Sequence, residues 1–255
     1  MSRMNIVKFD SLESTNKYCE ALDLTQVEDF TCYWALSQTA GIGQRGNHWE
    51  AAPRQNLTFS LVLHPTFLSA SHQFRLTQAL SLAICDFLSP FTSHLLPSIK
   101  WPNDIYVRMS STTEGSERHH YGKICGTLVS TRLSSNSISS AICGIGFNVN
   151  QTVFPEWVPN PTSLALLARR EFDLEPLLRH LLDCIEARYN VLREGRDLDP
   201  EYLDCLLNLG VSARYRYGDE VVLATITGVD PFGRLLLVAA DGRRLCCGMK
   251  EIALL

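Results

Sequence analysis

The stretch SIKWPNDIYV, residues 98–107, has the composition of an extended segment that a proline interrupts at its centre. Its middle five residues, KWPND at 100–104, bring together a cation, an aromatic ring, an amide and a carboxylate. Because proline ends regular strand pairing, we expect Asn103 and Asp104 to be displayed rather than buried in a ladder. A carboxylate near phosphates usually holds Mg²⁺, and the charge of Lys100 can neutralise phosphate. The segment is therefore a candidate binding site for an anionic ligand.

Two apolar runs follow this segment and predict strands at 124–131 and 137–149. The polar residues 108–122 that precede them predict an exposed loop. Lys123 stands at the start of the first run, where a lysine is often only a solvated edge charge. It becomes a fixed cation if its position faces a cavity. Two small residues, Gly144 and Gly146, stand near the end of the second run.

The remaining chain before residue 210 alternates between extended and helical patterns, which predicts an α/β body. Upstream we expect an apolar segment at 5–9, a short helix capped by Ser14 or Thr15 that runs to about Leu22, strands at 32–37 and 56–63, and an amphipathic helix at 71–89. Downstream we expect helices at about 162–170, 174–193 and 200–209.

From about residue 212 the periodicity changes from helical to extended. Three short strands are predicted at 219–228, 233–240 and 243–248. The sequence DPFG at 230–233 favours a type I turn, and the pair Asp241-Gly242 is a strong hairpin signal. A meander of this size predicts a small barrel.

The segment GIGQRG, residues 41–46, matches the pattern GxGxxG, but its surroundings exclude a dinucleotide-binding fold. Residues 47–55 contain a proline and lack helical periodicity, and no acidic residue ends a second strand about 20 residues further on. Two interpretations stay open. The loop cradles an anionic ligand with its backbone N–H groups and Arg45, or it is a flexible surface loop.

The composition excludes several classes of protein. The 255 residues are 45% apolar and carry 23 Lys plus Arg against 27 Asp plus Glu, a formal net charge of −4. A non-specific grip on nucleic acid needs clustered positive charge, so that partner is disfavoured. No apolar run approaches the roughly 20 residues of a membrane span, and the N-terminus lacks the apolar region of a secretory signal. We expect a soluble, cytoplasmic protein.

Nine cysteines are scattered through apolar stretches, at positions 19, 32, 85, 125, 143, 184, 205, 246 and 247. An odd count without CxxC spacing argues against a disulfide framework and against a structural zinc site. Buried, reduced thiols that pack as small apolar side chains are the favoured interpretation.

Taken together, the motifs resemble those of biotin–protein ligases in order and approximate spacing. The motifs are STN at 14–16, the glycine loop ending in Gly46 and Trp49, NLTFS at 56–60, KWPND at 100–104, GKICGTLVS at 122–130 and GIGFNVN at 144–150. The resemblance implies an α+β fold with two domains. Residues 1–210 would form the biotin/lipoate ligase catalytic domain, with a mixed or antiparallel sheet and helices, and residues 211–255 a small SH3-like β-barrel.

The resemblance also implies a two-step reaction with ATP and biotin as substrates. The biotin carboxylate attacks the α-phosphate of ATP to give biotinyl-5′-AMP, and a lysine of a biotin carboxyl carrier domain then takes the biotin. Both nucleophiles belong to substrates, which explains why the sequence shows no catalytic triad or metal-ligand cluster. The protein contributes positioning and charge stabilisation.

Site residues follow from the resemblance by position. Lys123 and Arg45 would be catalytic, with Lys123 contacting the biotin carboxyl and the α-phosphate. The implied biotin site comprises Ser14, Thr15, Asn16, Gln38, Gly41, Ile42, Gly43, Gln44, Trp49, Lys123 and Gly126. The implied nucleotide site comprises Arg45, Gly46, Lys100, Asn103, Asn148 and Glu251, the last within the segment 250–252. Asp104 would hold Mg²⁺.

The sequence departs from the family pattern in two places, the glycine loop and the insertion at 108–121, and it lacks a domain that some members carry. The loop usually reads GRGRRG, so Ile42 and Gln44 stand where arginines are expected. The polar insertion at 108–121 is longer than the usual connection, and we interpret it as a passive surface loop. The catalytic motif begins at Ser14, which leaves no room for an N-terminal helix-turn-helix, so DNA binding is not expected. A homodimer is left open.

Three alternative functions stay open. A lipoate–protein ligase or octanoyl transferase shares the catalytic fold. The altered loop is consistent with a catalytically weakened biotin- or adenylate-binding protein. The C-terminal barrel is also consistent with an interaction module on a passive scaffold, although Lys100, Asp104 and Lys123 argue against it.

Overall fold

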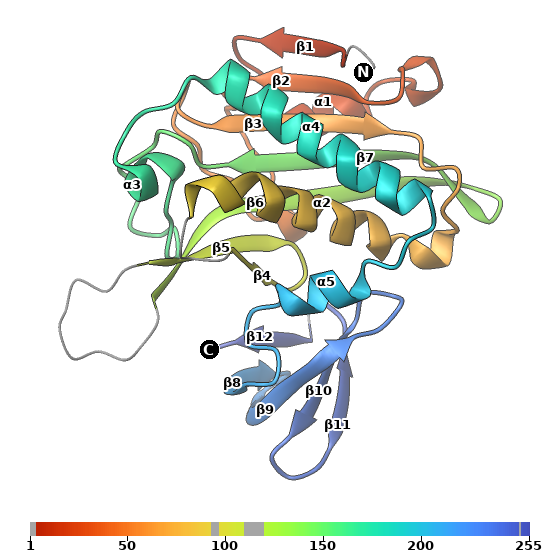
Figure 1. Ribbon diagram of the computed structural model, residues 1–255, viewed down its shortest axis with the longest axis vertical. Helices are drawn as coiled ribbons and strands as arrows, with labels where there is room; N and C mark the ends of the chain where they lie inside the picture. Colours follow the sequence, from red (N-terminus) through yellow and green to blue (C-terminus); the bar gives the residue numbers. More distant parts are fainter. Residues whose placement is uncertain (1–3, 93–96, 110–119, 250) are drawn as a thin grey trace.

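The computed structural model describes residues 4–92, 97–109, 120–249 and 251–255, which form two sheets joined through the helix α5 (Asp199–Asp204). Figure 1 shows the larger sheet above the smaller one. The larger sheet has seven strands in the order β1-β2-β3-β7-β6-β5-β4 across the described residues. Their bounds are β1 (Ile6–Phe9), β2 (Thr31–Ala35), β3 (Leu57–Leu63), β4 (Ser98–Lys100), β5 (Asp104–Met109), β6 (His120–Ser134) and β7 (Ser137–Phe147).

The larger sheet is mixed, as predicted. β1 runs parallel to β2, and the other neighbouring strands are antiparallel. The stretch 98–107 is a hairpin, in which β4 and β5 pair with Lys100 opposite Asp104. The proline therefore lies in the turn between two strands and does not break one strand in its middle. This turn, residues 101–103, places its two flanking charges side by side.

Helices cover the two faces of the larger sheet unequally (Figure 1). The long helices α2 (Phe74–Leu88) and α4 (Leu174–Arg193) lie across one face and enclose the main apolar core with it. The short helix α1 (Thr15–Glu20) packs on the other face, against β3 and β7. A further short helix, α3 (Leu164–Ala168), follows β7. In the part of the chain that the structure describes, no helix combines the length and apolar character needed to cross a membrane.

Side-chain alternation along β3 and β7 explains why the second face can hold a site. Phe59 and Ile145 belong to the core under α2 and α4. Since successive residues of a strand point to opposite faces, their neighbours Ser60, Gly144 and Gly146 point to the α1 face. That face therefore carries small and polar residues where the first face carries a core.

The smaller sheet has five antiparallel strands in the order β11-β10-β9-β8-β12 within the described residues. They are β8 (Ser212–Tyr217), β9 (Glu220–Val229), β10 (Leu235–Ala239), β11 (Arg244–Cys247) and β12 (Ile252–Leu254). The three predicted strands are confirmed as β9, β10 and β11, whereas β8 and β12 were missed. Only Tyr215 is buried in β8, and β12 has three residues, so neither shows a clear apolar alternation. The division of the chain at 210/211 stays a prediction.

Two further expectations are corrected or refined. The helix expected at 200–209 ends at Asp204, because the chain beyond it pairs with other strands: Leu206 bridges to Ile99 and Leu209 to Ile226. All nine cysteines are free, and six of them are buried, with Cys184 and Cys205 half-buried and Cys246 exposed.

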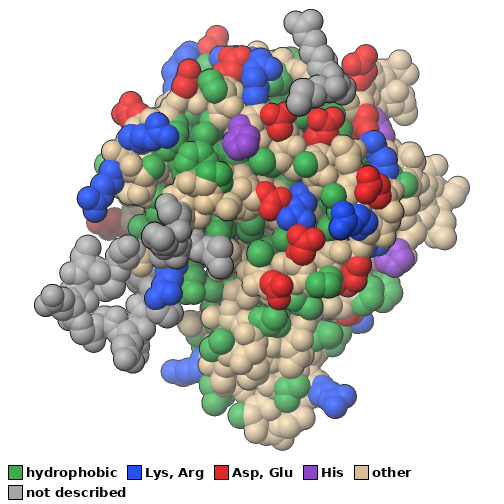
Figure 2. Space-filling view, viewed as in Figure 1, with side chains coloured by type: hydrophobic (Ala, Val, Ile, Leu, Met, Phe, Trp, Pro, Cys, Tyr) green, Lys and Arg blue, Asp and Glu red, His purple; other side chains and the backbone are tan. Residues whose placement is uncertain are grey.

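Figure 2 shows acidic and basic side chains interspersed over the face that carries α2 and α4.

Candidate active site

A cavity of about 290 Å³ lies on the α1 face of the larger sheet and reaches the smaller sheet. Most of the residues implied by the motifs line it: Ser14, Thr15, Asn16, Gln38, Ile42, Gly43, Gln44, Trp49, Lys100, Asn103, Asp104, Lys123 and Gly126. The fold therefore brings together residues from four separate motifs of the sequence.

One part of the cavity, which we call the polar end, is lined by Ser14, Thr15, Asn16 and Gln38, with the fully buried Ser60 behind them. The backbone N–H of Thr15 donates to Gln38 Oε1 at 2.7 Å. The Ser60 hydroxyl donates to Asn16 Oδ1 at 2.6 Å and lies 2.8 Å from Thr15 Oγ1. Ser14 is the N-cap of α1, but its side chain does not make the expected capping hydrogen bond. The polar end is thus neutral, buried except for the half-buried Gln38, and held by its own hydrogen bonds.

The amide nitrogen of Asn16 is the group at the polar end that a ligand can satisfy. Asn16 Nδ2 is buried and has no hydrogen-bond partner among the described residues. A buried donor without a partner costs about 1–3 kcal/mol. A neutral ligand with a carbonyl-type acceptor would recover that free energy.

Glycines form the sheet surface beneath the site, and we call Gly126, Gly144 and Gly146 the glycine floor. A Cβ atom on Gly144 would overlap the Asn16 amide, and one on Gly146 would overlap the Trp49 ring. A Cβ atom on Gly126 would lie 3.1 Å from Trp49 and 3.2 Å from Asp104. Gly126 and Gly146 are cross-strand partners in β6 and β7. The floor thus orders the site across the neighbouring strands β7, β6 and β5, from Asn16 past Trp49 to Asp104.

The glycine loop is a small hairpin that folds back on itself. Trp49 N donates to Gly41 O at 2.9 Å, and Gly43 N donates to Asn47 O at 2.7 Å. A Cβ atom on Gly41 would lie 2.6 Å from the Trp49 carbonyl oxygen, so the close approach requires glycine there. Trp49 lies over the glycine floor, and its indole N–H is buried with no partner in the described chain. The loop is therefore a wall of the cavity.

The other part of the cavity, the charged end, consists of Lys100, Asp104 and Lys123. Lys123 Nζ lies 2.7 Å from Asp104 Oδ2, and both side chains are about one-quarter exposed, at 24% and 28%. The same Nζ lies 5.5 Å from the centre of the Trp49 ring. Burial lowers the pKa of Lys100, and the nearby Lys123 lowers it further, while Asp104 acts in the opposite direction. Two cations facing one carboxylate favour an anionic ligand.

Lys123 is fixed in position by the chain that covers its strand. Its backbone N–H donates to Asn160 O at 2.7 Å, and its carbonyl accepts from Thr162 N at 2.9 Å. The strand edge at Lys123 is therefore paired, and the side chain faces the cavity. Of the two interpretations of this lysine, the structure supports the fixed cation.

Asn103 contradicts the expectation that it is displayed. The residue is only 4% exposed, and its Nδ2 donates to the Thr127 carbonyl. Since its amide is used inside the fold, Asn103 holds the turn 101–103 against β6. Asp104, by contrast, is partly exposed and lines the cavity, as expected.

Several residues implied for the site lie elsewhere. Asn148 is buried beside β6, where its Nδ2 donates to Thr162 O at 3.0 Å, and Glu251 accepts from Gly248 N at 2.7 Å in an exposed turn. Gly41 and Gly46 belong to the loop hairpin without lining the cavity. The Arg45 side chain and the whole of Lys250 lie outside the described residues, as do residues 110–119 of the polar insertion. The roles of these residues stay predictions.

The sequence did not point to the residue behind the polar end or to the part of the cavity wall that the smaller sheet supplies. Ser60 lies in a quoted motif, but its polar contact with Asn16 depends on the pairing of distant segments. The smaller sheet contributes Tyr215, Ile226, Leu235, Met249, Ile252, Ala253 and Leu254. Tyr215 is the single buried residue of β8, so no apolar alternation in the sequence singled it out.

Comparison with known proteins agrees with this geometry. Residues 8–148 match the biotin/lipoate A/B protein ligase family, and the chain belongs to that family. It is 27% identical over 243 residues to the bifunctional ligase/repressor BirA of Bacillus subtilis, covering 93% of this chain and 70% of that protein. It is 29% identical over 215 residues to the biotin–protein ligase of Schizosaccharomyces pombe, covering 78% of this chain and 33% of that protein.

Solved structures give the same fold. The biotin protein ligase from Aquifex aeolicus in complex with biotin and ATP superposes with a TM-score of 0.77 and 24% identity, covering 98% of both chains. This likeness confirms the expected fold class, an α+β body followed by a small β unit. The resemblance drawn from the motifs is confirmed as well.

Proposed function

We propose that this chain is an ATP-dependent ligase that activates biotin as biotinyl-5′-AMP and transfers it to a lysine of a carrier protein. The observation that carries the proposal is the joining of a neutral polar end and a charged end in one cavity. Biotin has the matching chemistry, with a neutral ureido ring at one end and a carboxylate at the other. The membership of the ligase family and the named relatives support the same reading.

The polar end suits the ureido ring because both are neutral and carry donors and acceptors. The ring carbonyl would accept from Asn16 Nδ2, the buried donor that has no partner in the described protein. The hydroxyls of Ser14 and Thr15 and the Gln38 amide offer further contacts from the same side. The biotin tail would then run over the glycine floor past Trp49 and bring its carboxylate to Lys123.

In the first step an oxygen of the biotin carboxylate attacks the α-phosphorus of ATP, and pyrophosphate leaves with the electrons of the broken P–O bond. Lys123 would hold the attacking carboxylate and the α-phosphate together, since its Nζ is the cation beside the end of the glycine floor. Lys100 would face the departing phosphates. The protein thus acts through orientation and charge, because the nucleophile belongs to the substrate.

In the second step a lysine amine of the acceptor attacks the carbonyl of biotinyl-5′-AMP, and AMP leaves. We propose a biotin carboxyl carrier domain as that acceptor and the cytoplasm as the setting. The nine free thiols agree with a reducing compartment.

Asp104 is suited to bind a magnesium ion whose other ligands would be mainly the phosphates of the nucleotide and water. It is the one carboxylate among the described residues that line the cavity, and Lys123 balances its charge. Magnesium is commonly bound through one or two carboxylates together with phosphates and waters. When bound, the ion would neutralise phosphate charge next to Lys100.

Biotin-dependent exchange of pyrophosphate into ATP tests the proposal. We expect exchange with biotin, no exchange when biotin is omitted, and none with lipoate. Exchange with lipoate instead of biotin would identify the other branch of the family. Biotin binding without exchange would contradict the ligase and leave a binding protein. Addition of a carrier domain then tests the second step by the mass of the modified acceptor.

A further inference from the structure

The turn between β4 and β5 is held by three different elements, one for each of its residues. Trp101 Nε1 donates to Gly233 O at 2.9 Å, in the smaller sheet. The Pro102 carbonyl accepts from the Tyr202 hydroxyl of α5 at 3.1 Å. Asn103 Nδ2 donates to the Thr127 carbonyl of β6. The residues that flank this turn are Lys100 and Asp104 of the charged end, so the turn determines where these two charges lie.

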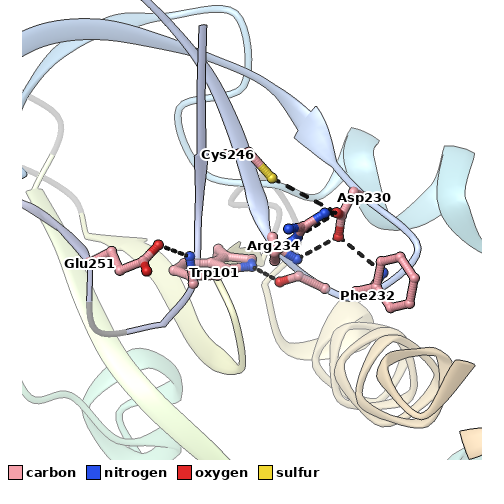
Figure 3. Close-up of polar contacts among 8 residues, drawn as sticks. Trp101, Asp230, Phe232, Arg234, Cys246 and Glu251 are labelled. Carbon is pink, nitrogen blue, oxygen red and sulfur yellow. Dashed lines mark hydrogen bonds and ion pairs between the residues drawn. The ribbon is translucent and has the colours of Figure 1, made fainter. Parts of the chain in front are cut away.

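The Trp101 contact differs from the other two because its acceptor lies in the smaller sheet. Gly233 lies in the turn between β9 and β10, which is built around the Asp230 carboxylate (Figure 3). That carboxylate accepts from Phe232 N at 3.0 Å and from Arg234 N at 2.9 Å, and it pairs with the Arg234 guanidinium at 2.6 Å. The Asp230 side chain is 12% exposed. The turn therefore presents the Gly233 carbonyl from a fixed position.

The same turn packs tightly against α2, one of the helices that cover the larger sheet. Gly233 has a φ of +82°, and a Cβ atom there would overlap the Phe74 ring at the start of α2. Phe74 in turn packs edge-on against Tyr202, with ring centres 5.7 Å apart. Gly233 accepts from Trp101, and Tyr202 donates to Pro102. Both of them therefore pack against the same ring, that of Phe74. The smaller sheet reaches the charged end through this contact.

We propose that Trp101 is a positioning residue for the adenylation step, through which the 230–234 turn of the smaller sheet fixes Lys100 and Asp104 toward the nucleotide. The inference rests on the proposed function. Loss of the indole N–H would free the turn 101–103 on one side and let the two charges shift. The polar end lies beyond Trp49 and would keep its biotin contacts.

Trp101→Phe tests the proposal, because it keeps an aromatic ring and removes the N–H. We expect the KM for ATP in pyrophosphate exchange to rise about fivefold, the equilibrium effect of one net hydrogen bond, with an unchanged KM for biotin. Trp34→Phe is the matched control. Trp34 is buried in β2, and its Nε1 has no partner in the described chain. That variant should lower thermal stability and leave the KM for ATP unchanged.

A pair of glycine substitutions tests the contact from the other side. Gly233 and Gly242 both lie in turns of the smaller sheet with positive φ, +82° and +89°, so alanine strains the backbone similarly at each. Around Gly242 no described atom lies within 4 Å of a Cβ atom. We expect Gly233→Ala to raise the KM for ATP and Gly242→Ala to leave it unchanged.

The double variant Trp101→Phe/Gly233→Ala separates positioning from direct contact with the nucleotide. If Trp101 acts through Gly233, the second substitution adds little to the first. Fully additive effects would assign Trp101 to direct nucleotide contact and overturn the proposal, as would an unchanged KM for ATP in Trp101→Phe. Absence of exchange in the unmodified protein would overturn the ligase function itself, which distinguishes the two failures.

Discussion

The two ends of the cavity are built in opposite ways. The polar end is buried and neutral, and its hydrogen bonds run between its own members, Thr15 with Gln38 and Ser60 with Asn16. The charged end is partly exposed, and its internal contact is one ion pair, Lys123 with Asp104. Its position comes from outside, through the contacts of the turn 101–103 with α5, β6 and the smaller sheet.

This difference suggests that one end of the cavity selects the substrate and the other end determines the rate of the chemical step. A buried hydrogen-bonding site rejects ligands that leave its groups unpaired, so the polar end can select the substrate. Fixed charges near a transferring phosphorus stabilise charge as it develops, so the charged end should carry most of the rate. Substitutions at the two ends should therefore change different kinetic constants.

Lys123→Ala should give the largest effect, because it removes the cation that bridges carboxylate and phosphate. We expect kcat of exchange to fall by roughly 10²–10³-fold, the range found when one preorganised charge-stabilising group is removed. Lys8→Ala is the control, because Lys8 is an exposed lysine on β1 that pairs with Glu175. A retained rate in Lys123→Ala would remove this lysine from its proposed role.

Gly144→Ala should act on the polar end alone. The new methyl group would displace the Asn16 side chain and disturb its bond with Ser60. We expect the KM for biotin to rise about tenfold, since one buried hydrogen bond is lost or strained, with the KM for ATP nearly unchanged. Gly228→Ala in β9 adds the same methyl group where no described atom lies within 4 Å, and it should be neutral. Equal changes in the KM for biotin and the KM for ATP would show that the two ends of the cavity do not act on separate substrates.

Lys100→Arg should change the pH dependence of ATP binding. Burial lowers the pKa of Lys100 below its ordinary value, whereas bound phosphate would favour the charged form. ATP binding should therefore weaken as pH rises through that lowered pKa, and folding stability should rise over the same window, because the unfolded chain keeps its proton longer. The guanidinium stays charged, so the variant should show a flat KM for ATP from neutral pH to about pH 10. An alkaline rise in KM that survives in Lys100→Arg would assign the effect to another group.

Ile42→Arg should have the smallest effect, at the loop that covers the space between the two ends. Ile42 lines the cavity and is partly exposed, so an added cation there would meet the adenylate phosphate under solvent screening. We expect release of biotinyl-5′-AMP to slow about threefold, the size of one exposed ion pair. Release can be followed by rapid filtration of the labelled adenylate. Equal release rates for the two proteins would show that the loop retains the adenylate without that charge.

Local sequence patterns predicted the parts of the fold that depend on neighbouring residues. The apolar alternation of 57–63 and the helical spacing of 74–88 indicated β3 and α2 because each pattern is complete within one element. The strand β8 was missed because its pairing with β9 and β12 leaves only Tyr215 buried. Its place depends on partners that the local pattern does not reveal.

The candidate site shows the same limit. Motif order pointed to Asn16, Lys123 and Asp104, and the fold brings them to one cavity. Asn103 was expected to be displayed, but its amide finds the carbonyl of Thr127 on another strand. The contact of Trp101 with Gly233 joins residues 132 positions apart and leaves no trace in either segment. Residue chemistry could be predicted from the sequence, whereas the assignment of each polar group to a ligand or to the fold depends on long-range contacts.

The distribution of the cavity wall along the chain has a consequence for biosynthesis. The polar end comes from residues 14–60, whereas β12 adds Ile252, Ala253 and Leu254 to the opposite wall. A chain emerging from the ribosome folds its N-terminal parts first. The helix α1 packs on β7, and Lys100, Asp104 and Lys123 all precede β7 in the chain. Both ends of the cavity can therefore form on the nascent protein before the last residues of the chain close the wall beside them.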